Sequence, residues 1–167
     1  NAVGEDFSSD TLALNLASDG QLTHSVGWRD NIAPFFKGAS GASAPTLTTI
    51  ANGARLYQFG VGDSVHVDFH VDHDIVPNST AFPHVHFFSD AAMSVGETVT
   101  WEFIYVKAKG HSQGESLTAA RTTLSMTYTA DGTEIAGEHI VLEHPTGLTL
   151  SEPDEVVLAE YKKTGGT

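Results

Sequence analysis

Residues 64–72 alternate strictly between apolar and polar side chains. Successive residues of a β-strand point to opposite faces, so this alternation predicts a half-buried strand. The predicted core face carries Val65, Val67, Phe69 and Val71, and the other face carries His66, Asp68, His70 and Asp72. A second strand is predicted over 81–88, after a Pro-Asn-Ser turn. Together the two strands predict a ladder of imidazoles and carboxylates.

The same two-residue period recurs along the rest of the chain, and no long stretch has the 3.6-residue period of a helix. Predicted strands cover 54–60, 97–109, 121–130, 134–143 and 155–162, with an Asp131-Gly132 hairpin turn between the third and fourth. Their predicted core residues are Val99, Trp101, Phe103, Tyr105, Leu124, Met126 and Tyr128. About seven or eight strands at this spacing predict an all-β fold, a jelly-roll-like antiparallel β-sandwich, with a closed barrel as the alternative.

The beginning of the chain follows a different pattern. Residues 1–27 are weakly patterned and rich in Asp, Ser and Gly, which predicts an extended N-terminal arm. Residues 28–53 carry small residues and two prolines, which predicts loop with a short strand around 46–50. The amino-acid composition does not change again further along the chain, so we expect 28–167 to form a single β-sandwich domain.

The composition limits the classes of function. The chain has 167 residues, no cysteine and a formal net charge of −13. An acidic surface repels phosphate backbones, so we expect no contact with nucleic acid. No apolar run approaches the ~20 residues of a membrane span, and the first residues lack a signal-peptide pattern. We therefore expect no membrane partner, and the absence of cysteine excludes disulfides and thiolate metal sites.

The pair His84-x-His86 is the strongest metal-binding signal. The two residues are two positions apart on a strand, so both imidazoles lie on one face, and their Cα atoms are ~6.6–7 Å apart. Such pairs often form part of zinc, iron or manganese sites. A third ligand is available from His66, His70 or Asp68 if the two strands pair in register. The pair, with Asp90 and Gly96, resembles part of a cupin motif, although the usual glutamate, preceding glycine and second motif are missing.

Other residues point away from catalysis. No Gly-x-Ser-x-Gly elbow marks a nucleophile, and we predict no catalytic residue and no cofactor. The favoured account of the histidines is a hydrogen-bonded network across paired strands, covered by a neighbouring subunit, with no metal bound. Metal binding by His84, His86, His66 and His70 is the alternative.

One segment is similar to a known family. The run from Phe69 to His111 resembles a segment of tailed-bacteriophage virion structural proteins. The shared features are His73-Asp74, Pro77, His84-Val85-His86, Gly96, Trp101 and Lys107-Ala108-Lys109-Gly110, with Trp28-Arg29-Asp30 as a short upstream entry. The resemblance covers residues 28–112. Asp72 stands where the family usually has proline, and the last third of the chain has no counterpart.

The resemblance implies a structural component of a virion, made in the host cytoplasm. The expected role is a capsid decoration or cement protein that binds and stabilises the assembled shell; a tail, neck or fibre-adaptor protein is the alternative. The expected partners are further copies, as a dimer or trimer, and the major capsid protein or other virion proteins. Aromatic and leucine residues with little local core to join are the interface candidates: Trp28, Phe35, Phe36, Leu12, Leu14 and Leu16.

Overall fold

The computed structural model describes residues 14–16, 22–24, 35–37, 44–50, 53–72, 75–109, 116–151 and 155–166, the first three strands by their backbone alone. The chain divides into two compact units, 1–32 and 33–167. All regular structure in the described residues is strand, so the all-β prediction is confirmed. The strands are β1 (Leu14–Leu16), β2 (Leu22–His24), β3 (Phe35–Lys37), β4 (Thr46–Thr49), β5 (Arg55–Gln58), β6 (Ser64–His70), β7 (Ser79–Ala81), β8 (His84–Phe88), β9 (Thr98–Ala108), β10 (Thr122–Thr129), β11 (His139–Glu143), β12 (Leu148–Leu150) and β13 (Val156–Gly165).

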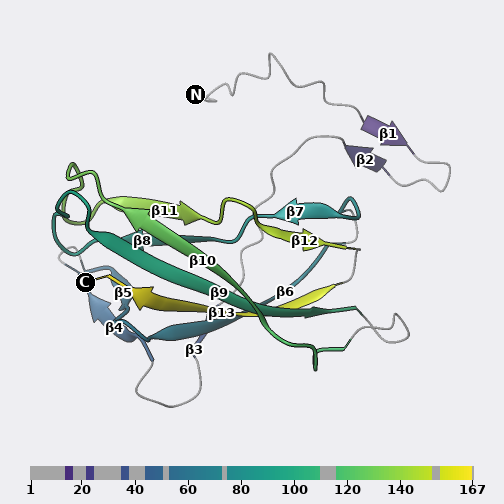
Figure 1. Ribbon diagram of the computed structural model, residues 1–167, viewed down its shortest axis with the longest axis horizontal. Coiled ribbons are helices and arrows are strands. Elements are labelled where there is room, and N and C mark those ends of the chain that lie inside the picture. The colour runs from purple at the N-terminus through teal and green to yellow at the C-terminus, as the bar shows by residue number, and fades with distance from the viewer. Residues whose placement is uncertain are drawn as a thin grey trace. The chain divides into compact units, whose positions relative to one another are not determined.

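The main element of the second unit is an antiparallel five-stranded sheet in the order β10-β9-β13-β6-β3 (Figure 1). The C-terminal strand β13 lies at its centre, paired with β9 on one side and β6 on the other. The predicted alternation holds: Val65, Val67 and Val71 are buried, whereas His66, Asp68 and His70 are exposed. Val99, Trp101, Phe103 and Met126 are buried as well, which confirms the parity predicted for β9 and β10.

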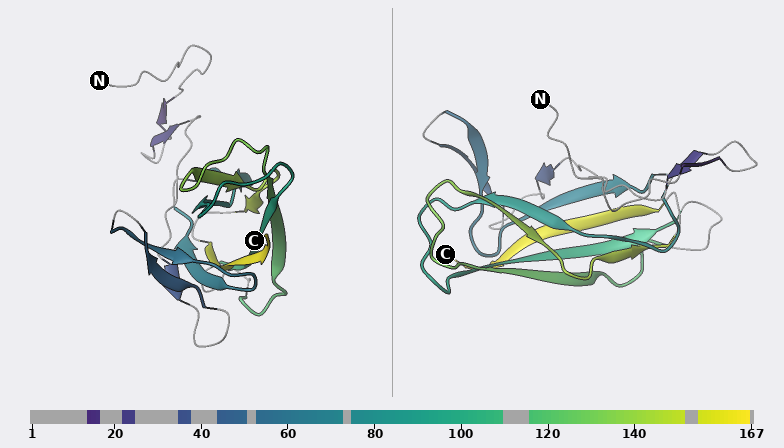
Figure 2. Two further views of the ribbon diagram at one scale, coloured as in Figure 1. Left: turned by 90° about the vertical axis from the view of Figure 1, so that its left-hand side faces the viewer. Right: turned by 90° about the horizontal axis from the view of Figure 1, so that it is seen from above.

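A second layer covers the apolar face of this sheet (Figures 1 and 2). It consists of the pairs β8–β11 and β7–β12, which follow one another along the same two chain segments. The two pairs are separated at Phe82 and Pro83, where the N–H of His144 donates to the carbonyl of Pro83 at 2.9 Å. One buried cluster joins Leu142, Leu148 and Leu150 of this layer to Trp101 and Phe103 of the sheet.

The strands connect differently from the predicted hairpin, and the condition for a ligand set shared by the two histidine strands is not met. β6 and β8 do not pair with each other, because β6 joins β13 and β3 whereas β8 joins β11. The Asp131-Gly132 turn does not close a hairpin, since β10 pairs with β9 and the chain then crosses to the other layer. Local turn residues predicted a change of direction correctly, but the apolar faces decided which strands became neighbours.

Other differences concern where strands begin and end. The stretch predicted over 134–143 is a strand only from His139, because Glu134 caps the preceding turn. Leu148–Leu150, not predicted as a strand, forms β12, and Phe35–Lys37, predicted as loop, forms β3. The short strand predicted around 46–50 is confirmed as β4, which pairs with β5.

The first unit is described through one hairpin only. β1 pairs antiparallel with β2, with Asn15 opposite Thr23. Leu14 and Leu16 therefore belong to one strand of a hairpin. Their side chains, and the remainder of 1–32, lie outside the described residues.

Candidate functional site

The outer face of the five-stranded sheet carries the first group of candidate residues. His66 of β6 lies opposite Glu160 of β13, and Glu160 accepts a 2.8 Å hydrogen bond from Nη2 of Arg121, which precedes β10. Burial alone would raise the pKa of Glu160. Hydrogen bonds from Ser64 and Arg121, with the positive charge of Arg121, outweigh burial and hold the pKa below its usual value. This face thus carries an ion pair between Arg121, at the start of β10, and Glu160 on the central strand β13.

The outer face of β8–β11 carries the second group. His86 Nδ1 lies 2.7 Å from His139 Nε2, within hydrogen-bonding distance, and the two rings stack at 4.9 Å between centroids. His84 meets His86 edge to face at 5.1 Å, and Phe88 stacks on His139 at 5.1 Å. His84 is itself oriented by a 3.3 Å hydrogen bond from Nδ1 to the carbonyl of Phe82. The result is an imidazole cluster (His84, His86 and His139) on a two-stranded sheet.

The two groups of histidines are not brought together. His66 and His70 belong to the five-stranded sheet, and His84 and His86 belong to the other layer. One metal ion therefore cannot be held jointly by the four alternative ligands, and that predicted set is wrong: His84, His86, His66 and His70. In the part of the chain that the structure describes, no three His, Asp or Glu side chains are placed to hold a metal ion.

His139 belongs to this cluster although no sequence pattern predicted it. His139 is 53 residues from His86, and its position follows from the β8–β11 register, in which His139 pairs with Phe88 and Val141 with His86. A period-2 pattern places His139 on a face of its own strand but says nothing about the neighbouring strand.

A buried ion pair lies at one end of the domain. Glu155 has no exposed surface, and its carboxylate accepts hydrogen bonds from Lys107 Nζ at 3.1 Å and the N–H of Ser151 at 3.0 Å. Lys107 Nζ also donates to Ser151 Oγ at 2.7 Å and to the carbonyl of Thr149 at 2.9 Å. The pair connects β9, the end of β12 and the start of β13, and no local sequence signal predicts it.

A concavity of about 310 Å³ lies beside this ion pair. It is lined by Tyr105, Val106, Lys107, Ser116, Ala119, Ala120 and Thr122. Lys107 is the one charged residue in that lining, and its Nζ is already engaged by Glu155. We therefore assign Lys107 to the stability of the fold.

At the opposite end of the sheet, Glu134 caps the turn after β10. Its carboxylate accepts hydrogen bonds from the hydroxyl of Tyr128, the N–H of Asp131 and the N–H of Gly132. The Tyr128 hydroxyl, followed by the backbone donors, lowers the pKa of Glu134 to about 2 despite burial. The same hydrogen bond raises the pKa of Tyr128 to about 12.

A partly buried tyrosine links the two layers. The hydroxyl oxygen of Tyr161 on β13 accepts a hydrogen bond from the backbone N–H of His84 on β8. Burial raises the pKa of Tyr161 well above its usual value, so its hydroxyl stays neutral. This contact positions the start of β8, and with it the imidazole cluster.

Four of the six predicted interface residues lie in the short strands β1 and β3. Phe35 and Phe36 lie in β3, where Phe36 pairs with His66, and Leu14 and Leu16 lie in β1. Leu12 and Trp28 lie outside the described residues, as do His73 and Asp74.

The structure contains no described helix long and apolar enough to cross a membrane. Comparison with protein families, curated proteins and solved structures produced no match to this chain.

Proposed function

We propose that this chain is a structural component of a tailed-phage virion, a capsid decoration or cement protein that acts as a homo-oligomer. We further propose that its second unit is a jelly-roll-like β-sandwich. One observation carries the proposal: the chemically distinctive side chains of the segment that resembles virion proteins lie on the outer sheet faces. His66, Asp68 and His70 occupy one outer face and the imidazole cluster occupies the other. Small-molecule sites are typically concave, whereas an open outer face offers the area that a protein partner can cover.

The proposed mechanism is linkage and not catalysis. A protein that binds the assembled shell more tightly than free shell subunits stabilises the shell by the difference in binding free energy. A specific contact buries ~1,200–2,000 Å² in total, an area that one outer sheet face and its neighbouring loops can supply. The net charge of −13 favours an exterior position, away from the packaged genome.

The test uses virions of the phage that encodes the chain. Mass spectrometry should find the chain in purified particles, and electron microscopy should place it on the capsid. Particles stripped of the protein should rupture at a lower temperature, and added wild-type protein should restore the rupture temperature. His86→Ala with His139→Ala should weaken that rescue, whereas Val95→Ala, a change in an exposed turn, should not. Absence of the chain from purified particles would contradict the proposal.

A tail, neck or fibre-adaptor role is the first alternative, because the same outer faces serve any protein contact. Location of the chain on the tail in the same images would select this alternative. The second alternative is a cupin-like metal-dependent enzyme. The observation nearest to it is the juxtaposition of His84, His86 and His139 on one surface, although these three imidazoles are not placed to hold a metal ion as they stand.

A further inference from the structure

Within the described residues, the edge strand β10 lacks the charge, the proline and the bulge that often protect an open sheet edge. It is an end strand of the five-stranded sheet, and in the described residues it pairs only with β9. Its eight residues, Thr122–Thr129, include no charged residue and no proline, and its register with β9 runs without a bulge. Natural sheet edges are usually kept apart by charge, proline, bulges or short length.

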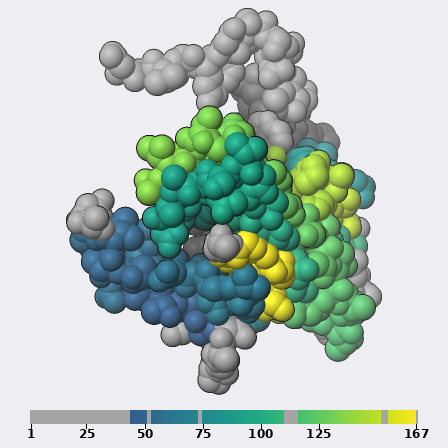
Figure 3. Space-filling view, turned by 60° about the vertical axis from the view of Figure 1, so that its left-hand side comes forward, coloured from purple at the N-terminus to yellow at the C-terminus, as the bar shows by residue number. Residues whose placement is uncertain are grey.

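The backbone of β10 therefore presents hydrogen-bonding groups outward. In an antiparallel ladder only alternate residues bond to the neighbour on one side, so the remaining N–H and C=O groups point to the open edge. The strand lies at the surface of the domain (green in Figure 3). Thr123, Ser125 and Thr127 are exposed on the outer face, and Met126 is buried on the inner one.

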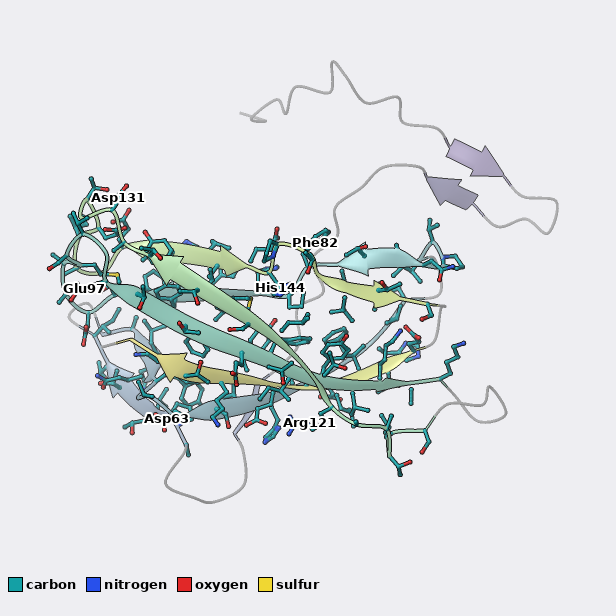
Figure 4. The ribbon with its side chains drawn as sticks, in the orientation of Figure 1. Asp63, Phe82, Glu97, Arg121, Asp131 and His144 are labelled. Atoms are coloured by element: carbon teal, nitrogen blue, oxygen red, sulfur yellow. The ribbon has the colours of Figure 1, made fainter. Side chains whose placement is uncertain are left out.

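The charges at the two ends of β10 are opposite. Arg121 precedes the strand, and Asp131 follows it at the other end (Figure 4), with Glu134 in the same turn and Glu138 in the next one. The Arg121 side chain remains 47% exposed although it bonds Glu160. Two antiparallel copies of β10 would place each Arg121 beside the acidic turn of the other copy. A strand with this charge pattern is complementary to itself.

We infer that β10 is the site of edge-to-edge pairing with a second copy of this chain, which forms one continuous antiparallel sheet across a two-fold axis. With the axis at Met126, Arg121 lies opposite Asp131 and Ser125 lies opposite Thr127. No like charges then meet within the strand, which matters for a chain of net charge −13. This inference rests on the homo-oligomer part of the proposed function and names its interface.

The test is sedimentation of the full chain over a range of concentrations. Wild type should form a dimer, and Ser125→Lys, which places cations on both sides of the axis, should weaken dimerisation by at least about tenfold. The matched control is Leu158→Lys, which places the same charge at an exposed position on the same outer face but on the central strand β13. This control should dimerise like wild type.

Hydrogen exchange provides a second measurement that does not depend on a variant. The outward amides of β10 should be protected at high protein concentration and exposed at low concentration.

Circular dichroism verifies that the variants are folded, and Thr123→Lys replaces Ser125→Lys if the latter is unfolded. A wild-type monomer at all concentrations, or a dimer unaffected by either lysine on β10, would overturn the inference. A monomer whose shell binding is lost in Ser125→Lys would instead assign the edge to a shell subunit. Because the rescue of stripped particles is measured separately, failure of the pairing is distinguishable from failure of the proposed function.

Discussion

Lys107 and Glu155 form an ion pair across 48 residues of sequence, with Nζ 3.1 Å from Oε1 and Glu155 fully buried. The N–H of Ser151 donates to the carboxylate of Glu155, and the hydroxyl oxygen of Ser151 accepts a hydrogen bond from the ammonium of Lys107. Each charge therefore has several partners. A buried pair of this kind contributes little net stability compared with an apolar pair, but removal of one partner leaves an unpaired charge.

We expect substitution of Lys107 and substitution of Glu155 to lower the free energy of unfolding by different amounts. Lys107→Met should destabilise the domain by ~3–5 kcal/mol, because the fully buried Glu155 is left without its cation. Glu155→Gln should cost less, because the Lys107 side chain keeps 24% of its surface exposed and can be hydrated. Urea unfolding of both variants measures the difference, with Lys162→Met on the outer face as the control. A larger loss in Glu155→Gln than in Lys107→Met would contradict this assignment.

The Tyr128–Glu134 contact should make stability depend on pH at two extremes. The pKa of Glu134 is lowered from 4.5 to about 2, so its contribution is complete above 4.5 and is lost as the pH falls towards 2. The pKa of Tyr128 is raised from 10.0 to about 12, so the neutral hydroxyl contributes below 10 and that contribution is lost as the pH rises towards 12. Melting temperatures of wild type and Tyr128→Phe across these ranges test both limits. The difference between the two proteins should be largest between pH 5 and 9. Equal pH profiles would show that this contact does not couple folding to protonation.

Gly147 should tolerate substitution far less than Gly53. Both have positive φ angles, 63° at Gly147 and 84° at Gly53. A Cβ on Gly147 would collide with the carbonyl oxygen of Ala81 in β7, whereas a Cβ on Gly53 meets no atom within 4 Å. Gly53→Ala should therefore cost only the ~1–2 kcal/mol of a left-handed conformation, and Gly147→Ala should cost clearly more because the β7–β12 pair must shift. Chemical denaturation of the two variants compares the costs directly.

Protein purified without an affinity tag should contain no stoichiometric transition metal. The reason is that His66 and His70 lie on a different sheet from His84 and His86, so the two strands do not supply one shared ligand set. Elemental analysis measures the metal content, with His84→Ala plus His86→Ala as the comparison. One tightly bound metal per chain in wild type, lost in the double variant, would select the metal-enzyme alternative.

Removal of residues 1–32 should leave the second unit folded. The boundary of the first compact unit falls at Ile32, and the described β1–β2 pairing is internal to that unit. We expect the truncated chain to retain its β-sheet circular dichroism and cooperative unfolding while its binding to stripped particles weakens. Loss of cooperative unfolding would make the first unit part of the folded core.

The alternation of side chains within single strands was determined by the sequence alone. Burial of Val65, Val67 and Val71 and exposure of His66 follow from a two-residue period that needs no knowledge of neighbours. The all-β class and the parity of β9 and β10 follow from the same local rule.

Neighbours across strands were decided only by the tertiary structure. The sequence placed His84 and His86 on one face, but the β8–β11 register brought His139 to them and kept His66 away. Lys107 and Glu155 likewise meet only because β13 enters the sheet between β9 and β6. The physical reason is that pairing depends on how distant apolar faces fit together when they leave water, and a local pattern contains no information about that fit.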